Sequence, residues 1–161
     1  MSIHPGNRIV HAALQTVAHM PGNAYNPLWL FGPSGTGKTT MIRELCSTIR
    51  ENPPHLCVRC IRADELLEML NQSERNMRTA FQEMFSGLDV LAVEDLHTLA
   101  DKPITQSLFG YLLSGLVSKG GQVVLTSTGD IGELQELQDT LSFRCDYLLV
   151  LETYFEKEAE A

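Results

Sequence analysis

The apolar residues of this chain follow two alternating patterns, one typical of buried strands and the other of helices. Short continuous apolar runs occur at residues 27–31, 55–61, 89–93, 120–128 and 147–152, in PLWLF, HLCVRCI, DVLAV, GGQVVLTST and YLLVLE. Such runs are typical of parallel strands that are covered on both faces. We therefore expect five strands in a central, mostly parallel sheet.

Between these runs the apolar spacing changes to that of amphipathic helices. Helical stretches are predicted at residues 7–20, from Lys38 onward, at 63–70 and 74–85, and at 104–117. The expected inward faces carry Ile9, Ala12, Ala13 and Val17; Ile42, Leu45, Cys46 and Ile49; Met77, Phe81 and Met84; and Ile104, Leu108, Leu112 and Leu116. Strands that alternate with helices predict an α/β fold of three layers.

Length and charge limit the classes of function. A chain of 161 residues with 43% hydrophobic content is expected to form one domain over residues 1–161. Its formal net charge of −8 argues against broad, unspecific nucleic-acid binding, which needs clustered Lys and Arg. The polar start MSIHPGNR and the absence of a long apolar run predict a cytoplasmic protein without a leader or membrane span.

The four cysteines do not form an expected metal site. Cys57 and Cys60 are three residues apart in a predicted strand, where their side chains point to opposite faces. One ion cannot be held from both faces, and no second pair lies nearby. We therefore expect buried, reduced cysteines.

The strongest chemical signal is GPSGTGKT at residues 32–39, which lies between a predicted strand and a predicted helix. It fulfils the phosphate-loop pattern, in which glycines let backbone N–H groups converge on phosphates at a helix N-terminus. Lys38 is expected to reach the β- and γ-phosphates, and the Thr39 hydroxyl to ligate Mg²⁺. The expected ATP-binding set is Gly32, Pro33, Ser34, Gly35, Thr36, Gly37, Lys38, Thr39 and Thr40.

Four further residues, from three stretches of the chain, could complete an ATPase site. Glu94 and Asp95 follow the third strand, at the edge where ligands bind in such sheets, so one would bind Mg²⁺ and the other orient the attacking water. Thr128 ends the fourth strand and is the candidate sensor of the γ-phosphate. Arg144 precedes the last strand and could act as an arginine finger on a neighbouring subunit's ATP.

Taken together, these stretches resemble the AAA+ domain of the DnaA-type bacterial replication initiators, over roughly residues 6–152. The resemblance rests on NRIVHAALQTVAHMPGNAYNPLWLFGPSGTGKT, DVLAVEDLHTLADK, GGQVVLTST and DTLSFRCDYLLVLE, in that order. It implies that Asn7 lies near the adenine pocket and that Lys102 contacts single-stranded DNA. It also implies that Asp95 is the second Walker B acid and that Arg144 is the finger.

The chain departs from the pattern of that family at several positions. Glu94 stands where the family has Asp, and Thr128 stands where it has an acidic residue. Ile104 and Thr140 replace arginines that the family uses for DNA contact and assembly. The sequence also ends after the base domain with an acidic tail at 153–161, so we expect the helical lid and the helix-turn-helix domain to be absent.

The leading hypothesis is a Mg-ATP-dependent switch in replication initiation or helicase loading that acts through other AAA+ subunits. With no lid, ATP hydrolysis is expected to be slow at most, single-stranded DNA binding weak, and duplex-specific binding absent. One alternative is an interaction scaffold that keeps the fold without hydrolysis, which the altered Glu94 leaves open. Another is a small P-loop kinase, against which the paired carboxylates and the lack of an arginine-rich lid argue.

Overall fold

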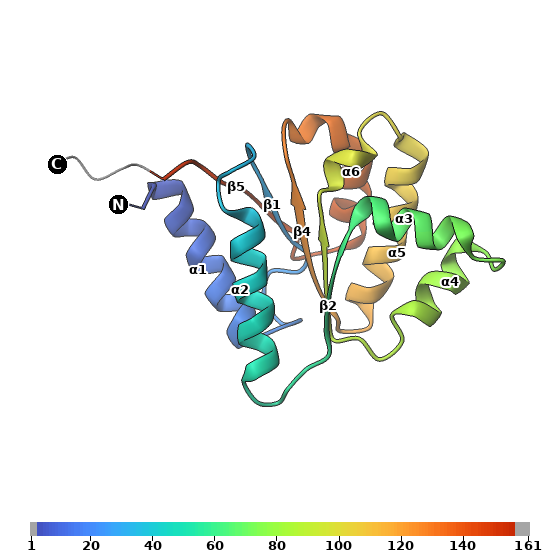
Figure 1. Cartoon of the computed structure of the whole chain (residues 1–161), viewed down its shortest axis with the longest axis horizontal. Coiled ribbons are helices and arrows are strands. Elements are labelled where there is room, and N and C mark those ends of the chain that lie inside the picture. The colour runs from blue at the N-terminus through green and yellow to red at the C-terminus, as the bar shows by residue number, and fades with distance from the viewer. Residues whose placement is uncertain (1–2, 157–161) are drawn as a thin grey trace.

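Five strands and six α-helices alternate along the chain in the computed structural model, which describes residues 3–156 (Figure 1). The strands are β1 Leu28–Phe31, β2 Val58–Arg62, β3 Val90–Glu94, β4 Gln122–Ser127 and β5 Leu149–Glu152. The helices are α1 Pro5–His19, α2 Lys38–Glu51, α3 Ala63–Gln72, α4 Met77–Met84, α5 Pro103–Ser118 and α6 Gln135–Arg144. Two short 3₁₀ helices, η1 Leu96–Leu99 and η2 Ile131–Leu134, follow β3 and β4.

The strands form one sheet in the order β2-β3-β4-β1-β5, and every pairing between them is parallel. The expected five-stranded α/β sheet is therefore confirmed. Strand β4 is central, and it separates β1 from β3. The loops that follow β1, β4 and β3 consequently meet at one edge of the sheet, because parallel strands end on the same side.

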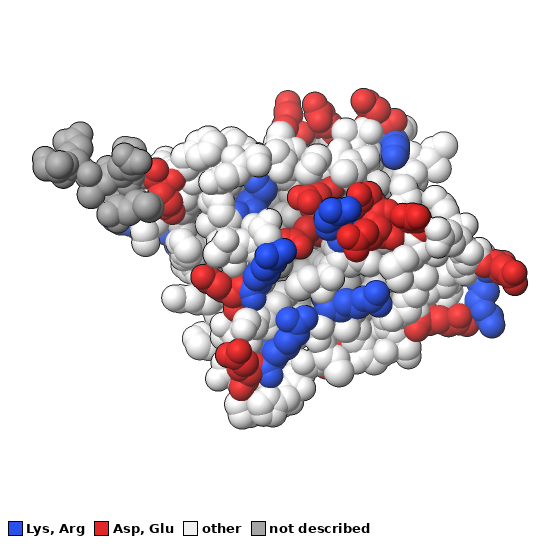
Figure 2. Space-filling view, viewed as in Figure 1, with Lys and Arg blue, Asp and Glu red and all other residues white. Residues whose placement is uncertain are grey.

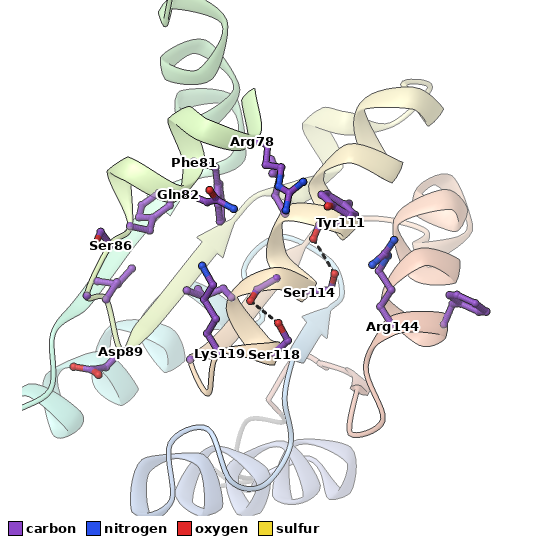
Figure 3. Close-up of a pocket in the computed structure, with 18 residues that line it drawn as sticks. Arg78, Phe81, Gln82, Ser86, Asp89, Tyr111, Ser114, Ser118, Lys119 and Arg144 are labelled. Carbon is purple, nitrogen blue, oxygen red and sulfur yellow. Dashed lines mark hydrogen bonds between the residues drawn. The ribbon is translucent and has the colours of Figure 1, made fainter. Parts of the chain in front are cut away.

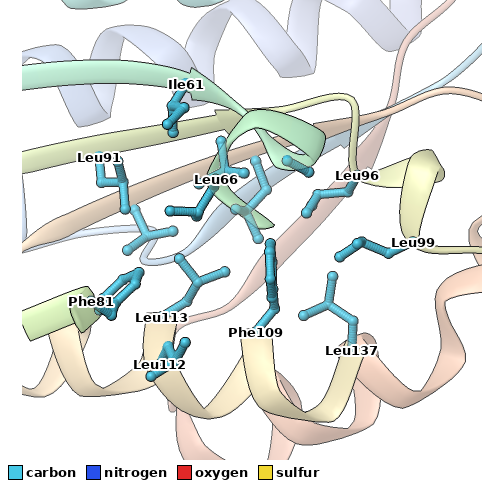
Figure 4. Close-up of a cluster of buried hydrophobic side chains, with 14 of the residues drawn as sticks. Ile61, Leu66, Phe81, Leu91, Leu96, Leu99, Phe109, Leu112, Leu113 and Leu137 are labelled. Atoms are coloured by element: carbon cyan, nitrogen blue, oxygen red, sulfur yellow. The ribbon is translucent and has the colours of Figure 1, made fainter. Parts of the chain in front are cut away.

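Helices cover both faces of the sheet and enclose two separate apolar cores. Helices α1 and α2 pack on one face with alternate strand residues such as Leu28, Leu30 and Ala92. Helices α3 to α6 pack on the other face with Trp29, Leu91 and their neighbours (Figure 4). Strand side chains point alternately to the two faces, which is why these strands are apolar throughout rather than at every second residue.

Two predicted helix faces differ from the structure in detail. In α1 the buried stripe is Val10, Ala13, Leu14 and Val17, whereas Ile9 is 60% exposed and Ala12 is also exposed. In α5, Leu112 of the predicted inward-facing row is buried, but Ile104 of the same row is 86% exposed. Ile104 lies in the first turn of the helix, directly after Pro103, where the helix has not yet reached the core.

Helix α6 was not predicted from the sequence, and it packs against α5. Its segment, QELQDTLSFR, buries only Leu137 and Leu141, so its apolar periodicity is weak. The acidic tail expected at 153–161 is described only as far as Glu156, and the remainder lies outside the described residues. Within the described residues, no helix is both long and apolar enough to span a membrane.

The cysteines agree only in part with the expectation of buried thiols. All four are free, and Cys46 and Cys145 are buried, but Cys60 is half-buried and Cys57 is exposed. Cys57 lies just before β2 rather than inside it, which explains its exposure. The described residues contain no cluster of three or more His, Cys, Asp or Glu side chains that could hold a metal ion.

Candidate functional site

The phosphate loop connects β1 to α2 at the centre of the sheet. Its start is fixed by a hydrogen bond from Gly32 N to Ser127 O of β4, at 3.2 Å. Gly37 precedes α2 with φ at 95°, a left-handed conformation that glycine adopts at low cost. Among the described residues, no side chain caps the first turn of α2, so the positive end of the helix is available to an anion.

The side chain of Lys38 is buried beneath this loop. Its Nζ donates to Gly32 O at 2.8 Å and to Pro33 O at 2.9 Å. Burial lowers the pKa of Lys38, and the negative charge of Asp95 opposes that shift. Lys38 therefore lies between the loop carbonyls and the acidic end of β3, and the hydroxyl-bearing Thr39 and Thr40 beside it are exposed.

Glu94 and Asp95 end β3 at the same edge of the sheet. Glu94 Oε1 is buried and lacks a hydrogen-bond partner among the described residues. Burial and the adjacent Asp95 raise the pKa of Glu94, while Arg43 of α2 opposes the shift. Asp95 adopts φ of 60°, which is uncommon for a residue with a side chain and occurs preferentially at functional sites.

The end of β4 holds the loop after β3 in place through two contacts. Thr126, which is 3% exposed, accepts a hydrogen bond from Asp95 N at 3.2 Å. Thr128 N donates to His97 Nδ1 at 3.3 Å. Because β4 lies between β3 and β1, Thr128 is situated between the two carboxylates and the phosphate loop. Thr126 and His97 were not among the predicted site residues, although both lie in the stretches that carried the signal.

Asn7 is fully buried at the start of α1, and its amide is engaged by the C-terminal segment. It donates to Tyr154 O at 2.7 Å and Glu156 Oε1 at 2.9 Å, and accepts from Tyr154 N at 2.9 Å. The same segment contacts the phosphate loop, since Thr153 and Thr36 share a hydrogen bond of 2.7 Å between their hydroxyls. In this structure Asn7 thus joins α1 to the residues that follow β5.

Arg144 lies away from the phosphate loop of its own chain. It ends α6, shortly before β5 begins, at the sheet edge opposite to the phosphate loop. Its guanidinium carbon is 4.6 Å from the centre of the Tyr111 ring, a cation–π contact. Figure 3 shows it in a groove of about 820 Å³ between α4, α5 and the end of α6, which Arg78 and Lys119 also line.

Lys102 is exposed just before α5 and lies among acidic side chains. It lines a smaller groove of about 370 Å³ together with Asp64 and Glu68 of α3. Figure 2 shows acidic side chains gathered over α3 on this face of the molecule. The surroundings of Lys102 therefore differ from the basic surface that a nucleic-acid backbone favours.

The oxygen groups at the carboxyl edge fit a magnesium ion. Magnesium in nucleotide sites is held by one or two protein oxygens together with phosphates and water. Glu94 Oε1 is such an oxygen, buried and without a donor in the described part of the chain, and the Thr39 hydroxyl is exposed at the loop. These residues would hold the ion, which would neutralise charge on the phosphate oxygens when bound.

The glycine-rich loop lies between the parallel strand β1 and a helix, and the two carboxylates come at the end of β3, with one strand, β4, between β1 and β3. This arrangement defines a P-loop NTPase of the AAA+ type. The comparison with protein families then makes the assignment specific. Residues 2–152 match the family described as the bacterial DnaA ATPase domain, and this chain belongs to that family.

Among curated proteins, the chromosomal replication initiator protein DnaA of Pelobacter propionicus is 33% identical over 146 residues. The match covers 90% of this chain and 32% of that protein, so the chain spans about a third of its relative's length.

Solved structures give the same picture of the fold. Domain III of the Thermotoga maritima replication initiation protein DnaA matches with a TM-score of 0.79 and 27% identity, covering 96% of this chain and 65% of that one. A replication initiator DnaA bound to AMPPCP and single-stranded DNA matches with a TM-score of 0.78 and 23% identity. That match covers 97% of this chain and 49% of the other and supports the fold.

Proposed function

We propose that this chain binds Mg-ATP at the loop between β1 and α2 and acts as a nucleotide-dependent switch in DNA replication initiation or helicase loading. The observation that carries the proposal is the α2 N-terminus, with Lys38 beneath it, and the buried Glu94 oxygen at the same sheet edge. Within residues 3–156 the helix end has no side-chain cap and the oxygen has no hydrogen-bond partner. Membership of the DnaA ATPase domain family and the AMPPCP bound to a structural relative support it.

In the proposed complex, Lys38 exchanges its bonds to two loop carbonyls for bonds to the β- and γ-phosphates. The exchange needs little movement, because the carbonyls that Lys38 now contacts belong to the loop that would surround the phosphates. Backbone N–H groups of residues 33–39 and the exposed hydroxyls of Thr39 and Thr40 contribute the remaining contacts. Thr39 and Glu94 would hold the magnesium ion.

Hydrolysis, where it occurs, would depend on groups on either side of the γ-phosphate. Asp95 would orient the attacking water, and Thr128 would contact the γ-phosphate from the neighbouring strand β4. The hydrogen bond from Asp95 N to Thr126 fixes the backbone from which the carboxylate projects. Because Asp95 and Thr128 come from adjacent strands, a change at the γ-phosphate can be transmitted to the loop after β3.

Arg144 would act on the ATP of another AAA+ subunit rather than on its own. Arg144 precedes the start of β5, whereas the phosphate loop follows the end of β1, and these two strands are parallel. The two groups therefore lie at opposite edges of the sheet, and one chain cannot bring them together. The proposed partner is a second copy of this chain or a full-length initiator, whose nucleotide would lie against the end of α6. Asn7 would contact adenine after exchange of its present bonds to residues 154–156.

Contact with single-stranded DNA through Lys102 is proposed to be weak. The net charge of −8 and the carboxylates of Asp64 and Glu68 beside Lys102 oppose a nucleic-acid backbone.

A direct test is a titration of a fluorescent ATP analogue, with Mg²⁺, against the wild-type chain and its Lys38→Ala variant. Lys119→Ala is the matched control, because Lys119 is an exposed lysine at the end of α5, away from the loop. The proposal predicts that only Lys38→Ala weakens binding, by about 10-fold or more, since one charge-assisted phosphate contact contributes about 1.5–3 kcal/mol. Equal affinity of all three proteins would disprove it.

A non-hydrolysing scaffold is the second candidate, and Glu94 favours it. The raised pKa of Glu94 means that its carboxylate is held in the protonated form more readily than usual, which weakens a metal ligand. A scaffold would bind the nucleotide without turnover, even when a full-length initiator is added. Phosphate release in that mixture above the rate of the initiator alone would exclude the scaffold.

A further inference from the structure

Two cysteine sulfurs are in contact between α2, the helix that follows the phosphate loop, and the strand β2. Cys46 Sγ of α2 and Cys60 Sγ of β2 are 3.2 Å apart. Cys46 is fully buried, whereas Cys60 is half-buried because β2 is the edge strand of the sheet. Nothing in the proposed nucleotide chemistry uses either thiol.

The geometry of this pair is close to that of a disulfide. A disulfide requires a sulfur–sulfur distance of about 2.05 Å, so the two atoms would need to approach by roughly 1.1 Å. Helix α2 packs directly on the face of the sheet to which Cys60 belongs, and both residues lie in or against the same apolar core. The sulfur–sulfur distance therefore leaves only a short approach for bond formation.

The surroundings of Cys60 favour its reactive form. Contact with Cys46 lowers the pKa of Cys60 to about 7, although burial and Glu94 oppose the shift, and the positive charges of Arg50 and Arg43 on α2 assist it. The same contact and burial raise the pKa of Cys46. Figure 2 shows basic side chains across the α2 and β2 region of the surface. A partly exposed cysteine near positive charge is the kind of residue that oxidants attack.

We propose that Cys46 and Cys60 form an oxidation site that closes to an intramolecular disulfide when the protein meets a peroxide. The Cys60 thiolate attacks one peroxide oxygen, the O–O bond breaks, and Cys60 becomes a sulfenic acid as water is released after protonation. The Cys46 sulfur then attacks the Cys60 sulfur, the S–O bond breaks, and a second water leaves with the Cys46 proton. Two thiols are oxidised and one hydrogen peroxide is reduced to two waters.

The disulfide would fix the helix of the phosphate loop to the edge of the sheet. Helix α2 begins at Lys38, and the last residue of β2, Arg62, pairs in register with Glu94. The bond would close a loop of 15 residues between positions 46 and 60. Such a bond restricts the unfolded chain and is expected to raise Tm by several degrees.

The sequence makes the test simple, because trypsin separates the three relevant cysteines. Cleavage after Arg43, Arg50, Arg59 and Arg62 places Cys46 in peptide 44–50, Cys57 in 51–59 and Cys60 in 60–62. The full-length chain is treated with hydrogen peroxide, its remaining thiols are blocked with N-ethylmaleimide under denaturing conditions, and the digest is analysed by mass spectrometry. Cys57→Ala is the matched control, since Cys57 is exposed and three residues from Cys60.

The proposal predicts a cross-linked pair of peptides 44–50 and 60–62 in the wild type and in Cys57→Ala, reversed by dithiothreitol. It also predicts a higher Tm for the oxidised than for the reduced protein, and no such change in Cys60→Ala. Full blocking of Cys46 and Cys60 by N-ethylmaleimide after peroxide treatment would overturn it. A sulfinic acid at Cys60 without a cross-link, or a disulfide between two chains, would overturn it as well. The mapping on wild-type protein decides the question even where a variant fails to fold.

Discussion

Glu94 combines two properties that are in conflict. One of its oxygens is buried without a hydrogen-bond partner in the described part of the chain, yet it lies where a cation would be held. Burial of an unpaired carboxylate costs folding free energy, and the raised pKa expresses that cost. Glu94 therefore lowers the stability of the protein when it is ionised, and a bound cation would offset that cost.

We predict that Glu94→Gln stabilises the metal-free protein at neutral and alkaline pH. A carboxyl whose pKa is raised on folding destabilises the protein above that raised pKa, and the effect disappears as pH falls towards its ordinary value of 4.5. The difference in Tm between variant and wild type should thus be positive at pH 8 and shrink towards pH 4.5. Thermal unfolding in EDTA across this range measures it. A difference that is constant with pH would contradict this account.

At the residue scale, the sequence predicted the loop and the carboxylates but not the contacts that fix them. The phosphate-loop pattern depends on local spacing, so Lys38 and Thr39 could be placed without a structure. The bond from Asp95 to Thr126 depends on β3 and β4 being adjacent, which the sequence alone does not specify. The sequence predicts Thr128 as the sensor, and the structure shows that the residue in direct contact with Asp95 N is Thr126.

At the scale of elements, the segment after β5 holds α1 on the sheet. Glu156 accepts hydrogen bonds from His4 N at 2.8 Å and Asn7 Nδ2, and Tyr154 stacks on His4 with ring centres 4.1 Å apart. These bonds lower the pKa of Glu156, so its carboxylate stabilises the protein above the ordinary pKa of 4.5 and the contribution is lost as pH falls through the lowered value. Asn7 is the centre of this connection.

Asn7→Ala is predicted to lower the free energy of unfolding by about 1–3 kcal/mol, because it leaves Tyr154 N and O without their buried partner. Gln15→Ala is the control, since Gln15 is an amide on the exposed face of the same helix and should change stability by less than about 0.5 kcal/mol. Urea unfolding of the three proteins distinguishes them. Similar losses in both variants would mean that helix propensity, not the Asn7 contacts, is responsible.

The differences between prediction and structure in α1 and α6 have opposite physical causes. Helix α1 carries two neighbouring apolar stripes, one with Ile9 and Ala12 and the other with Val10 and Leu14. Both stripes fit the helical period equally well. Only packing against α2 and the sheet selects the second stripe. Helix α6 has the reverse problem, because too few apolar residues mark it and contact with α5 stabilises it.

At the scale of the molecule, the phosphate loop and the proposed finger Arg144 lie at opposite edges of the sheet. The phosphate loop follows the end of β1, and Arg144 precedes the start of β5, which pairs with β1 in parallel. If Arg144 acts as the proposed finger, a complete hydrolytic site would consequently need two subunits. The order of motifs in the sequence suggested this arrangement, but the separation of Arg144 from its own loop is evident only from the strand pairing.

We predict that the ATPase rate per subunit rises steeply with protein concentration or on addition of a full-length initiator. Arg144→Ala should reduce that rate by at least about 10-fold, as expected for a finger that stabilises transferred charge, without changing ATP affinity. Arg78→Ala is the matched control, because Arg78 lines the same groove and lies over the same Tyr111 ring. A rate that is flat with concentration, or equal losses in both variants, would contradict a shared site.

The most direct test of the central claim is the effect of Mg²⁺ on ATP affinity in the wild type and in Glu94→Gln. If the phosphates face Glu94 across a bound ion, Mg²⁺ should strengthen ATP binding by about 10-fold or more in the wild type, equivalent to roughly 1.4 kcal/mol. Glu94→Gln should lose most of that gain and still bind ATP in EDTA as the wild type does. The same gain from Mg²⁺ in both proteins would show that Glu94 does not face the bound nucleotide.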